Sequence, residues 1–400
     1  MSTIESVEHL HANAGWRNYH YLKVTTSDGV AGWAEYDEAL RSPGVTAVIE
    51  KLAPHVIGKP VHDVERLTTR LGILTRPAPG SAVTMGIGAI ENAVLDAKAR
   101  TLGVPCYSLL GGKVRDTIRV YWSHCATWRI SLPQWYGNEI NHIDQVVELG
   151  AEVADSQFGA LKTNIFLYDD TGKPRSWFPG FGQPDEPGLN VERDVLDNIV
   201  RHLGALREGA GPATDILIDL NFNARTEGYL RIARELADLD LFWIEIDHDS
   251  PTGLSRVREA STSAISGGET LFDVKGFLPY FQAGSLDVAI IDTIWNGTWR
   301  SMKMAAAAAA FEVNVAPHNY YGHLCTMMSA HFAAAVPNLR IMETDIDRLP
   351  WDDDLVTHAP EFVDGHLVIP DRPGWGTEPI EEAIRAHPPE EVGDLLSMRR

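Results

Sequence analysis

Seven ionisable residues lie at the ends of predicted strands, and the last six recur at a nearly constant spacing. They are Lys162, Asp219, Glu245, Glu269, Asp292, His318 and Glu343. From Asp219 onward the separations are 26, 24, 23, 26 and 25 residues, which is about the length that one strand–helix unit of an α/β barrel needs. Ionisable groups at the ends of buried strands are costly unless they are paired or bind a metal. The spacing therefore predicts a site at the carboxyl ends of successive parallel strands.

Three of these residues, Asp219, Glu245 and Glu269, end neighbouring predicted strands, so their carboxylates can converge. Close carboxylates repel one another, and one or more would stay protonated without a cation nearby. A hard divalent ion with oxygen ligands removes this repulsion, and Mg²⁺ fits best. The alternative is that the three are surface carboxylates that cap helix N-termini.

His318 and Asp292 end two further neighbouring strands and are candidates for acid–base chemistry. An adjacent carboxylate accepts a hydrogen bond from one ring nitrogen and raises the basicity of the other. The alternative for His318 is a capping or packed histidine, but its match to Asp292 favours a catalytic pair. For His323, which follows Gly322 near the start of a predicted helix, we expect structural capping or loop packing.

Short apolar runs alternating with amphipathic helices must position these side chains. The runs are YWSHC (121–125), GALKTNIF, DILIDLNFN, LFWIEID, SAISGGET, LDVAIIDTIW, FEVNVAPH and LRIMETD. Continuous apolar strands alternating with helices indicate a buried parallel sheet. The segment 168–188, rich in Pro, Gly and aromatic residues, is predicted to be a loop inserted after the second strand.

The first 60 residues differ, because they predict an antiparallel meander of three strands with a turn at Ser27–Gly29. Helical patterns follow at 44–58, 61–74 and 85–103, the last ending at Gly103, a suitable C-cap. The tail after Trp351 is rich in Pro and Gly and contains one late helical pattern, EPIEEAIRA.

Charge and composition restrict the classes of partner. The chain has 400 residues and a formal net charge of −21, which argues against nucleic acid and anionic membranes. An anionic small substrate would then need a local positive group. No signal peptide and no run of about 18 apolar residues is found. Three cysteines without a CxxC pair indicate reduced thiols in a cytoplasmic protein.

The chain resembles the enolase superfamily, in its mandelate racemase/muconate lactonizing enzyme branch, over nearly its whole length. The motifs that carry the resemblance are residues 86–121, LKTN (161–164), IDLN (218–221), WIE (243–245), GGET (267–270), DTIWNG (292–297) and VAPH (315–318). Each motif alone is weak evidence, whereas the set in this order is highly specific.

The resemblance implies a modified TIM barrel of the (β/α)7β type, an α/β fold, with an N-terminal α+β capping domain. We expect the capping domain at 1–118, the barrel at 119–355, and a C-terminal segment, 356–400, that packs back on the capping domain. The resemblance also implies one Mg²⁺ per subunit, held by Asp219, Glu245 and Glu269. It further implies a small-molecule carboxylate substrate and a homo-oligomer. Lys162 would supply positive charge, and Glu343 would bind the substrate carboxylate, as a protonated donor if it acts as an acid.

One departure from the racemase pattern decides between reactions. Where racemases carry a second lysine in a Lys-x-Lys pair on the second strand, this chain has Asn164, and an amide cannot take a proton. A single His318–Asp292 pair still suffices for elimination, with Tyr168 or Tyr320 as a possible helper. We therefore expect a Mg²⁺-dependent dehydratase of aldonates or aldarates. The alternatives are an α-hydroxyacid racemase or epimerase, and a sugar-acid sensor without turnover.

Substrate contacts are expected from the capping loops and the strand ends. The loop after the first strand carries Trp16, Arg17 and Asn18, the loop after the third carries Asp37, Glu38 and Arg41, and the inserted segment carries Arg175 and Trp177. For any one of them, a solvated loop position is an equal alternative, and the inserted segment could instead pack between subunits. Our substrate-binding candidates are Arg17, Asn164, Asn221 and Tyr320.

Overall fold

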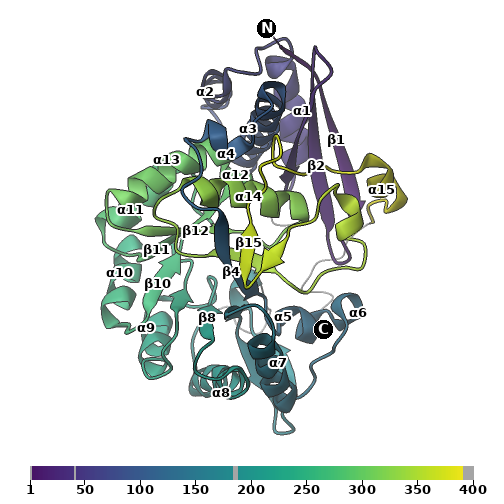
Figure 1. Cartoon of the computed structure of the whole chain (residues 1–400). Helices are drawn as coiled ribbons and strands as arrows, with labels where there is room; N and C mark the ends of the chain where they lie inside the picture. The colour runs from purple at the N-terminus through teal and green to yellow at the C-terminus, as the bar shows by residue number, and fades with distance from the viewer. Residues whose placement is uncertain (1, 40–41, 183–187, 391–400) are drawn as a thin grey trace.

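Eight parallel strands form the centre of the protein, shown in Figure 1 as a computed structural model that describes residues 2–39, 42–182 and 188–390. They are β4 (Thr117–Ser123), β5 (Ala160–Thr163), β8 (Asp215–Asp219), β9 (Trp243–Glu245), β10 (Ala264–Gly267), β11 (Val288–Asp292), β12 (Asn314–His318) and β13 (Met342–Asp345). The spatial order is β13–β4–β5–β8–β9–β10–β11–β12. A parallel bridge between Val315 and Leu339, just before β13, closes the ring.

A helix follows each of the first seven barrel strands and covers the outside of the ring (Figure 1). These helices are α7 (Ile143–Asp155), α8 (Arg193–Ala210), α9 (Thr226–Glu235), α10 (Pro251–Ala260), α11 (Asp273–Gln282), α13 (Thr298–Ala309) and α14 (His323–Ala335). In α8 the residues Leu196, Ile199, Leu203 and Leu206 are buried, the 3–4 spacing of one helix face. The expected (β/α)7β architecture is confirmed.

The interior of the barrel holds a small core separate from the larger one under the helices. Tyr121, Leu217, Trp243, Ile290 and Ala316 pack there, each from a different strand. Because strand residues alternate between two faces, the neighbours of these residues point outward to the helices. The filled interior leaves room for a site only above it, at the strand ends.

The N-terminal part is the predicted α+β cap, with the antiparallel strands β1 (Ile4–Asn13), β2 (Asn18–Thr26) and β3 (Ala31–Tyr36). Its helices are α1 (Val45–Val56), α2 (Val64–Leu74), α3 (Ser81–Leu102) and α4 (Cys106–Leu109). β3 lies directly on α3, since a Cβ at Gly32 would come within 2.3 Å of the Ala93 carbonyl oxygen. Gly103 ends α3 with φ of 68°, as its C-cap position predicts.

The C-terminal segment runs back over both parts. It contains η2 (Asp353–Leu355), β14 (Phe362–Val363), β15 (His366–Val368) and α15 (Glu381–Ala386), and residues 391–400 lie outside the described residues. β15 pairs with the first half of β4, and the Trp375 indole donates to the Trp33 carbonyl at 2.8 Å. Sequence patterns predicted α15 but not this hairpin, whose strands are only two and three residues long. The domain boundaries remain predictions.

The segment inserted after β5 is more ordered than a loop. It forms a hairpin of β6 (Phe166–Tyr168) and β7 (Pro174–Ser176), then the short helix η1 (Pro179–Phe181), and residues 183–187 lie outside the described residues. Asp169 Oδ1 accepts the backbone N–H groups of Thr171 and Lys173, at 2.8 and 3.0 Å. Gly172, with φ of 85°, completes the turn. These are hairpin-turn residues, and the prediction of a plain loop overlooked them.

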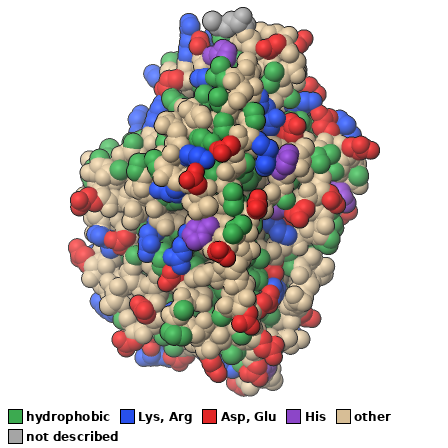
Figure 2. Space-filling model, in the orientation of Figure 1, with side chains coloured by type: hydrophobic (Ala, Val, Ile, Leu, Met, Phe, Trp, Pro, Cys, Tyr) green, Lys and Arg blue, Asp and Glu red, His purple; other side chains and the backbone are tan. Residues whose placement is uncertain are grey.

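The surface agrees with the acidic composition. On the face in Figure 2, Asp and Glu side chains are most dense toward the lower end, and Lys and Arg are interspersed without a continuous basic area. Within the described part of the chain, no helix is long and apolar enough to span a bilayer. Cys106, Cys125 and Cys325 are buried and unpaired.

Asp96, fully buried on α3, joins the cap to the C-terminal segment. Its carboxylate accepts the N–H groups of Trp33 and Trp375 and the Arg100 Nε–H, each at 2.8 Å. We expect Asp96→Asn to lower the free energy of unfolding by about 2–4 kcal/mol. The variant loses the negative charge, and its side-chain NH₂ group would point at N–H groups that need an acceptor. A lower urea midpoint would report this loss. Asp238→Asn, at an exposed position, is the control, and equal midpoints for the two variants would contradict the assignment.

Candidate active site

A cavity of ≈ 690 Å³ lies where the carboxyl ends of the barrel strands meet the cap. Its barrel wall includes Lys162, Asn164, Asp219, Asn221, Glu269, His318, Tyr320 and Glu343. Its capping wall includes Trp16, Arg17, Asn18, Asp37 and Glu38. Most side chains that the sequence nominated are therefore brought to one place. Arg41 lies outside the described residues.

Strand register aligns the nominated residues. Asp219 is paired with Glu245 across β8 and β9, and Asp292 is paired with His318 across β11 and β12. Glu269 lies two residues beyond the end of β10, after Gly268 with φ of 102°, a value that strongly favours glycine. Paired residues on adjacent parallel strands sit at the same level, so the period of about 25 residues in the sequence becomes a ring of charged groups.

The Lys162 ammonium lies at the centre of the acidic side chains. Its Nζ is 3.0 Å from Glu245 Oε2, 2.9 Å from Glu343 Oε1 and 4.0 Å from Asp219 Oδ2. Burial disfavours the charged amine, but Glu245 and Glu343 outweigh it and raise the pKa of Lys162 well above its ordinary value. Lys162 is thus a permanent positive charge within an acidic protein.

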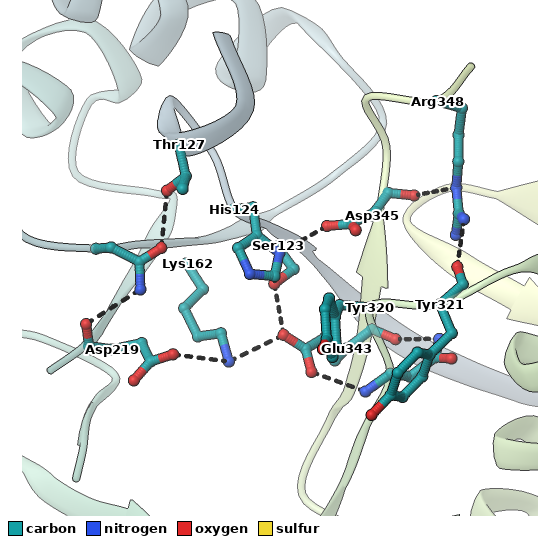
Figure 3. Close-up of polar contacts among 12 residues, drawn as sticks. Ser123, His124, Thr127, Lys162, Asp219, Tyr320, Tyr321, Glu343, Asp345 and Arg348 are labelled. Carbon is teal, nitrogen blue, oxygen red and sulfur yellow. Dashed lines mark hydrogen bonds and ion pairs between the residues drawn. The ribbon is translucent and has the colours of Figure 1, made fainter. Parts of the chain in front are cut away.

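Glu343 has the environment of an ionised carboxylate rather than of an acid. Burial would raise its pKa, but Lys162 and His318 hold the pKa of Glu343 well below its ordinary value. Its oxygens accept hydrogen bonds from the Ser123 hydroxyl at 2.5 Å (Figure 3) and from the Asn319 N–H at 2.8 Å. These contacts favour a charged acceptor, so the structure lends no support to Glu343 as a protonated donor.

The carboxyl groups of Glu245, Asp247 and Glu269 have fewer hydrogen-bond and cationic partners than Glu343. Burial, together with the repulsion of neighbouring carboxylates, raises the pKa of Glu245 to about 8 and that of Asp247 to about 6, and raises the pKa of Glu269 well above its ordinary value. Glu245 Oε1 and Asp247 Oδ2 are buried and have no hydrogen-bond partner among the described residues. Unpaired buried carboxylate oxygens are costly, and a hard cation is the partner that suits them.

The donor chemistry fits Mg²⁺, although the side chains now turn to other cations. No three His, Cys, Asp or Glu side chains in the described ranges could hold a metal ion as they stand. Glu245 Oε2 bonds Lys162, and Glu269 Oε2 lies 3.2 Å from His318 Nε2. Glu245 and Glu269 each have a second carboxylate oxygen that these two contacts do not use, and these oxygens are candidate ligands for a shared ion.

His318 and Asp292 form the expected pair, with Nδ1 2.6 Å from Asp292 Oδ2. Asp292 Oδ1 accepts the N–H groups of Ile294 and Trp295, both at 2.8 Å. These bonds hold the carboxylate in place, so Nδ1 carries the hydrogen and Nε2 is directed to the cavity. Burial lowers the pKa of His318, but Glu269 and Asp292 outweigh burial and raise it to about 10.

Asn164 and Asn221 brace Asp219. The backbone N–H and side-chain amide of Asn221 donate to the two Asp219 carboxylate oxygens at 2.8 and 2.9 Å. The Asn164 amide donates to the Asp219 carbonyl oxygen at 3.3 Å, and its own oxygen accepts from the Thr127 hydroxyl at 2.8 Å. Both amides also line the cavity, and their contact with substrate stays a prediction.

Arg17 is the cationic group on the capping wall. Its Nη2 donates to the Tyr320 carbonyl oxygen, and its guanidinium lies 4.7 Å from the Tyr320 ring centroid. Nε and Nη1 are buried and have no hydrogen-bond acceptor within the described residues. Two unused donors of a buried guanidinium beside the cavity indicate a site for an anionic or hydroxylated group.

Four of the nominated residues lie away from the cavity wall. The Tyr168 hydroxyl bonds His202 Nδ1 at 2.6 Å, which leaves Tyr320 as the tyrosine of that pair beside the cavity. His323 begins α14, and its Nε2 lies 2.7 Å from Asp353 Oδ1, in keeping with a packing role. Arg175 is exposed and Trp177 is buried elsewhere. The inserted segment instead places Phe178 and Phe181 on the wall.

The nominated set omitted two features of the site. Asp247 lies two residues after Glu245, and strand alternation could have placed both on one face. His124 follows β4, and its Nδ1 lies 2.9 Å from Asp345 Oδ1. Figure 3 shows the two side chains directed toward each other. For the other seven strands, the candidate was the ionisable residue at the strand end. The same criterion selects His124 in YWSHC.

Comparison with known proteins agrees with this geometry. Residues 11–111 match the mandelate racemase/muconate lactonizing enzyme N-terminal domain, and residues 146–383 match the enolase C-terminal domain-like family. A D-xylonate dehydratase of Haloferax volcanii is 29% identical, over 92% of this chain and 86% of its own. A D-galactonate dehydratase family member of Streptomyces bingchenggensis is 30% identical, over 100% and 96%.

A crystal structure from Burkholderia xenovorans is more similar, with 60% identity, a TM-score of 0.96 and coverage of 98% of both chains. That protein is provisionally named an L-alanine-DL-glutamate epimerase, and its crystal contained magnesium and fumarate. The two domain matches together cover most of the sequence, in the order that a cap followed by a barrel requires. The chain belongs to the enolase superfamily, in its mandelate racemase/muconate lactonizing enzyme branch.

Proposed function

We propose that the protein is a Mg²⁺-dependent dehydratase of acid sugars, aldonates or aldarates, that yields 2-keto-3-deoxy acids. The observation that carries the proposal is the cavity in which the His318–Asp292 pair lies near Lys162 and a cluster of buried carboxylates, two of whose oxygens have no partner among the described residues. Asn164, which occupies the position of a second lysine base, favours elimination over two-base racemisation. The dehydratase names of two relatives, each matched over 86% or more of its own length, support the same reaction.

The substrate carboxylate would bind beside Lys162. Mg²⁺, held by Asp219, Glu245 and Glu269, would supply further positive charge there and make the neighbouring C–H more acidic. Asn221 and Asn164 keep Asp219 oriented through the bonds at 2.8, 2.9 and 3.3 Å. Because Lys162 is buried and permanently charged, it stabilises the negative charge that develops on the carboxylate oxygens.

His318 would remove the proton from the carbon next to the carboxylate. Asp292 accepts the Nδ1–H bond at 2.6 Å and stabilises the imidazolium that forms. The electron pair of the broken C–H bond becomes a C2–C3 double bond as the C3 hydroxyl departs with a proton as water. The resulting enol then converts to the 2-keto acid. Elimination thus needs a base at C2 and an acid near the C3 oxygen.

The capping wall suits a hydroxylated chain that extends away from the carboxylate. Arg17 offers two unused donors there, and Asp37, Glu38 and Asn18 offer further polar groups. Trp16 and Phe178 provide apolar area beside them. A polyhydroxy acid combines these demands better than a purely apolar side chain would.

Epimerisation is the second candidate, and one observation favours it: the 60% identical Burkholderia xenovorans protein bears an epimerase name. Both reactions begin with removal of the α-proton. They differ in the next step, which is loss of a hydroxyl group in one case and return of a proton on the opposite face in the other. A racemase needs a second base where this chain has Asn164.

Turnover of an acid-sugar library separates these reactions. We expect at least one aldonate or aldarate to yield a 2-keto-3-deoxy acid with Mg²⁺, and EDTA to abolish the product. The measurement is semicarbazide detection of the keto acid, with proton NMR of the C2 hydrogen in D₂O. Inversion at C2 or exchange of its hydrogen, without keto acid, would support the epimerase instead.

The two histidines of the APHNYYGH segment should behave differently. We expect His318→Asn to lower kcat by at least ~10³-fold, because general-base catalysis contributes about 10²–10⁴-fold and Asn cannot take the proton. His323→Asn, the matched control, should keep kcat within about tenfold, because His323 contacts Asp353 outside the cavity. Steady-state kinetics on the best library substrate measures both, and equal losses would contradict the assignment.

Arg17 should act in binding. Arg17→Met keeps much of the side-chain volume but removes the donors, so we expect KM to rise on the order of 10- to 100-fold with little change in kcat, as loss of a charged hydrogen bond predicts. Arg66→Met, at an exposed position on α2, is the control. An unchanged KM for Arg17→Met would show that the substrate does not reach the capping wall.

A further inference from the structure

The cavity contains a second histidine–carboxylate pair that the mechanism above leaves unused. His124 follows β4, and its Nδ1 lies 2.9 Å from Asp345 Oδ1 at the end of β13. The imidazole stacks on Trp128 with ring centroids 4.2 Å apart. His124 has φ of 50°, a left-handed conformation that costs energy for a residue with a side chain. Stacking, ion pair and backbone together fix the ring in one orientation.

Both histidine pairs face the same cavity, which His124 and His318 line from different strands. The Tyr320 ring neighbours both, with its centroid 5.7 Å from that of His124 and 5.0 Å from that of His318. Nε2 of His124 has no hydrogen-bond partner within residues 2–39, 42–182 and 188–390. Its free nitrogen is therefore available to a molecule in the cavity, whereas Nε2 of His318 lies 3.2 Å from Glu269 Oε2.

His124 lies one level closer to the cap than the carboxylate-binding groups. Glu343 and Asp345 are two residues apart and project from the same face of β13. Ser123 bonds Glu343, which in turn contacts Lys162, whereas His124, the next residue along, bonds Asp345 (Figure 3). A substrate whose carboxylate lies beside Lys162 would thus extend its C3 substituent toward the His124–Asp345 level.

We propose that His124 is the general acid that protonates the departing C3 hydroxyl, and that Asp345 is its positioning residue. The inference rests on the proposed dehydratase function and assigns its second proton-transfer group. The His124 Nε2–H bond breaks as an O–H bond forms and the C3–O bond breaks, with release of water. His318 has accepted the C2 proton, whose electron pair forms the C2–C3 double bond. His124 then regains a proton from water and His318 releases its extra proton to water, which restores both imidazoles.

One histidine near C2 and another near C3 would allow elimination without the second lysine base that racemases carry. Lys-x-Lys chemistry places a second base beside the α-carbon, and Asn164 cannot do this. A histidine at the level of C3 serves elimination, because the second proton transfer of a dehydration takes place at the C3 oxygen.

A leaving group that needs no proton tests the proposal. The probe is the 3-deoxy-3-fluoro derivative of the acid sugar that the wild-type enzyme dehydrates best. We expect His124→Asn to lower kcat for loss of water by ~10²–10⁴-fold and kcat for loss of fluoride by less than ~10-fold. His318→Asn should lose both reactions, because each begins with removal of the C2 proton. His55→Asn, on the exposed side of α1, should change neither.

Retained fluoride release also shows that the His124→Asn variant is folded and binds substrate. In D₂O, the same variant should still exchange the C2 hydrogen of the hydroxylated substrate. Equal loss of water and fluoride release, or loss of C2 exchange, would overturn the acid role and assign His124 to binding or to C2. Undiminished dehydration by the variant would also overturn it while leaving the proposed function intact. If wild-type protein forms no keto acid from any acid sugar, the proposed function fails, and this inference fails with it.

Discussion

The repulsion among carboxyl groups gathered above one barrel is the constraint on which the rest of the structure depends. Asp219, Glu245, Asp247, Glu269, Asp292 and Glu343 converge there, and Lys162 and His318 are their cationic neighbours. Ionised groups in a buried space are stable only when positive charge or hydrogen-bond donors compensate them. Three features of the site provide this compensation. They are a permanently charged lysine, a histidine whose pKa is raised, and amides that donate hydrogen bonds to Asp219. Two carboxylate oxygens still lack a partner among the residues that the structure describes, and these argue most directly for a divalent cation.

The fold supplies the positions, and the cap completes the enclosure. Parallel register places Asp219 beside Glu245 and Asp292 beside His318, so helices on the outside set the spacing of charges on the inside. On the cap, buried Glu35 of β3 accepts the N–H groups of Gly322 and Cys325 at 2.7 and 2.9 Å. That contact fixes the start of α14, five residues after His318, and thereby connects the capping strand that leads to Asp37 with the segment that carries His318. The capping wall and the His318–Asp292 pair are thus joined by one continuous set of contacts.

Much of this arrangement could be predicted from the sequence, because the signal is periodic. Charged residues at apolar strand ends every 23 to 26 positions predicted the barrel, the site at its carboxyl end and the pairing of Asp292 with His318. Other features depend on contacts that no local pattern encodes. The hairpin of β14 and β15 is too short for an alternation signal, and the ionisation of Glu343 depends on Lys162 and His318 from other strands. Tyr168 was a plausible acid by type, but only the fold shows that its hydroxyl faces His202. His124 stood at the end of the first strand, and the strand-end rule would have found it there.

The proposed chemistry requires two things of the same cavity: a cation bound at the carboxylate cluster, and proton transfer beside it. Binding of the cation comes first, because proton removal depends on its charge. Calorimetric titration of metal-free protein with Mg²⁺ tests this most directly. The account predicts one ion bound per chain in the wild-type protein and greatly weakened binding in Glu245→Gln, with the fold of the variant intact by circular dichroism. Absence of Mg²⁺ binding by the wild type, or undiminished binding by Glu245→Gln, would contradict the claim that these carboxyl groups converge to hold a metal ion.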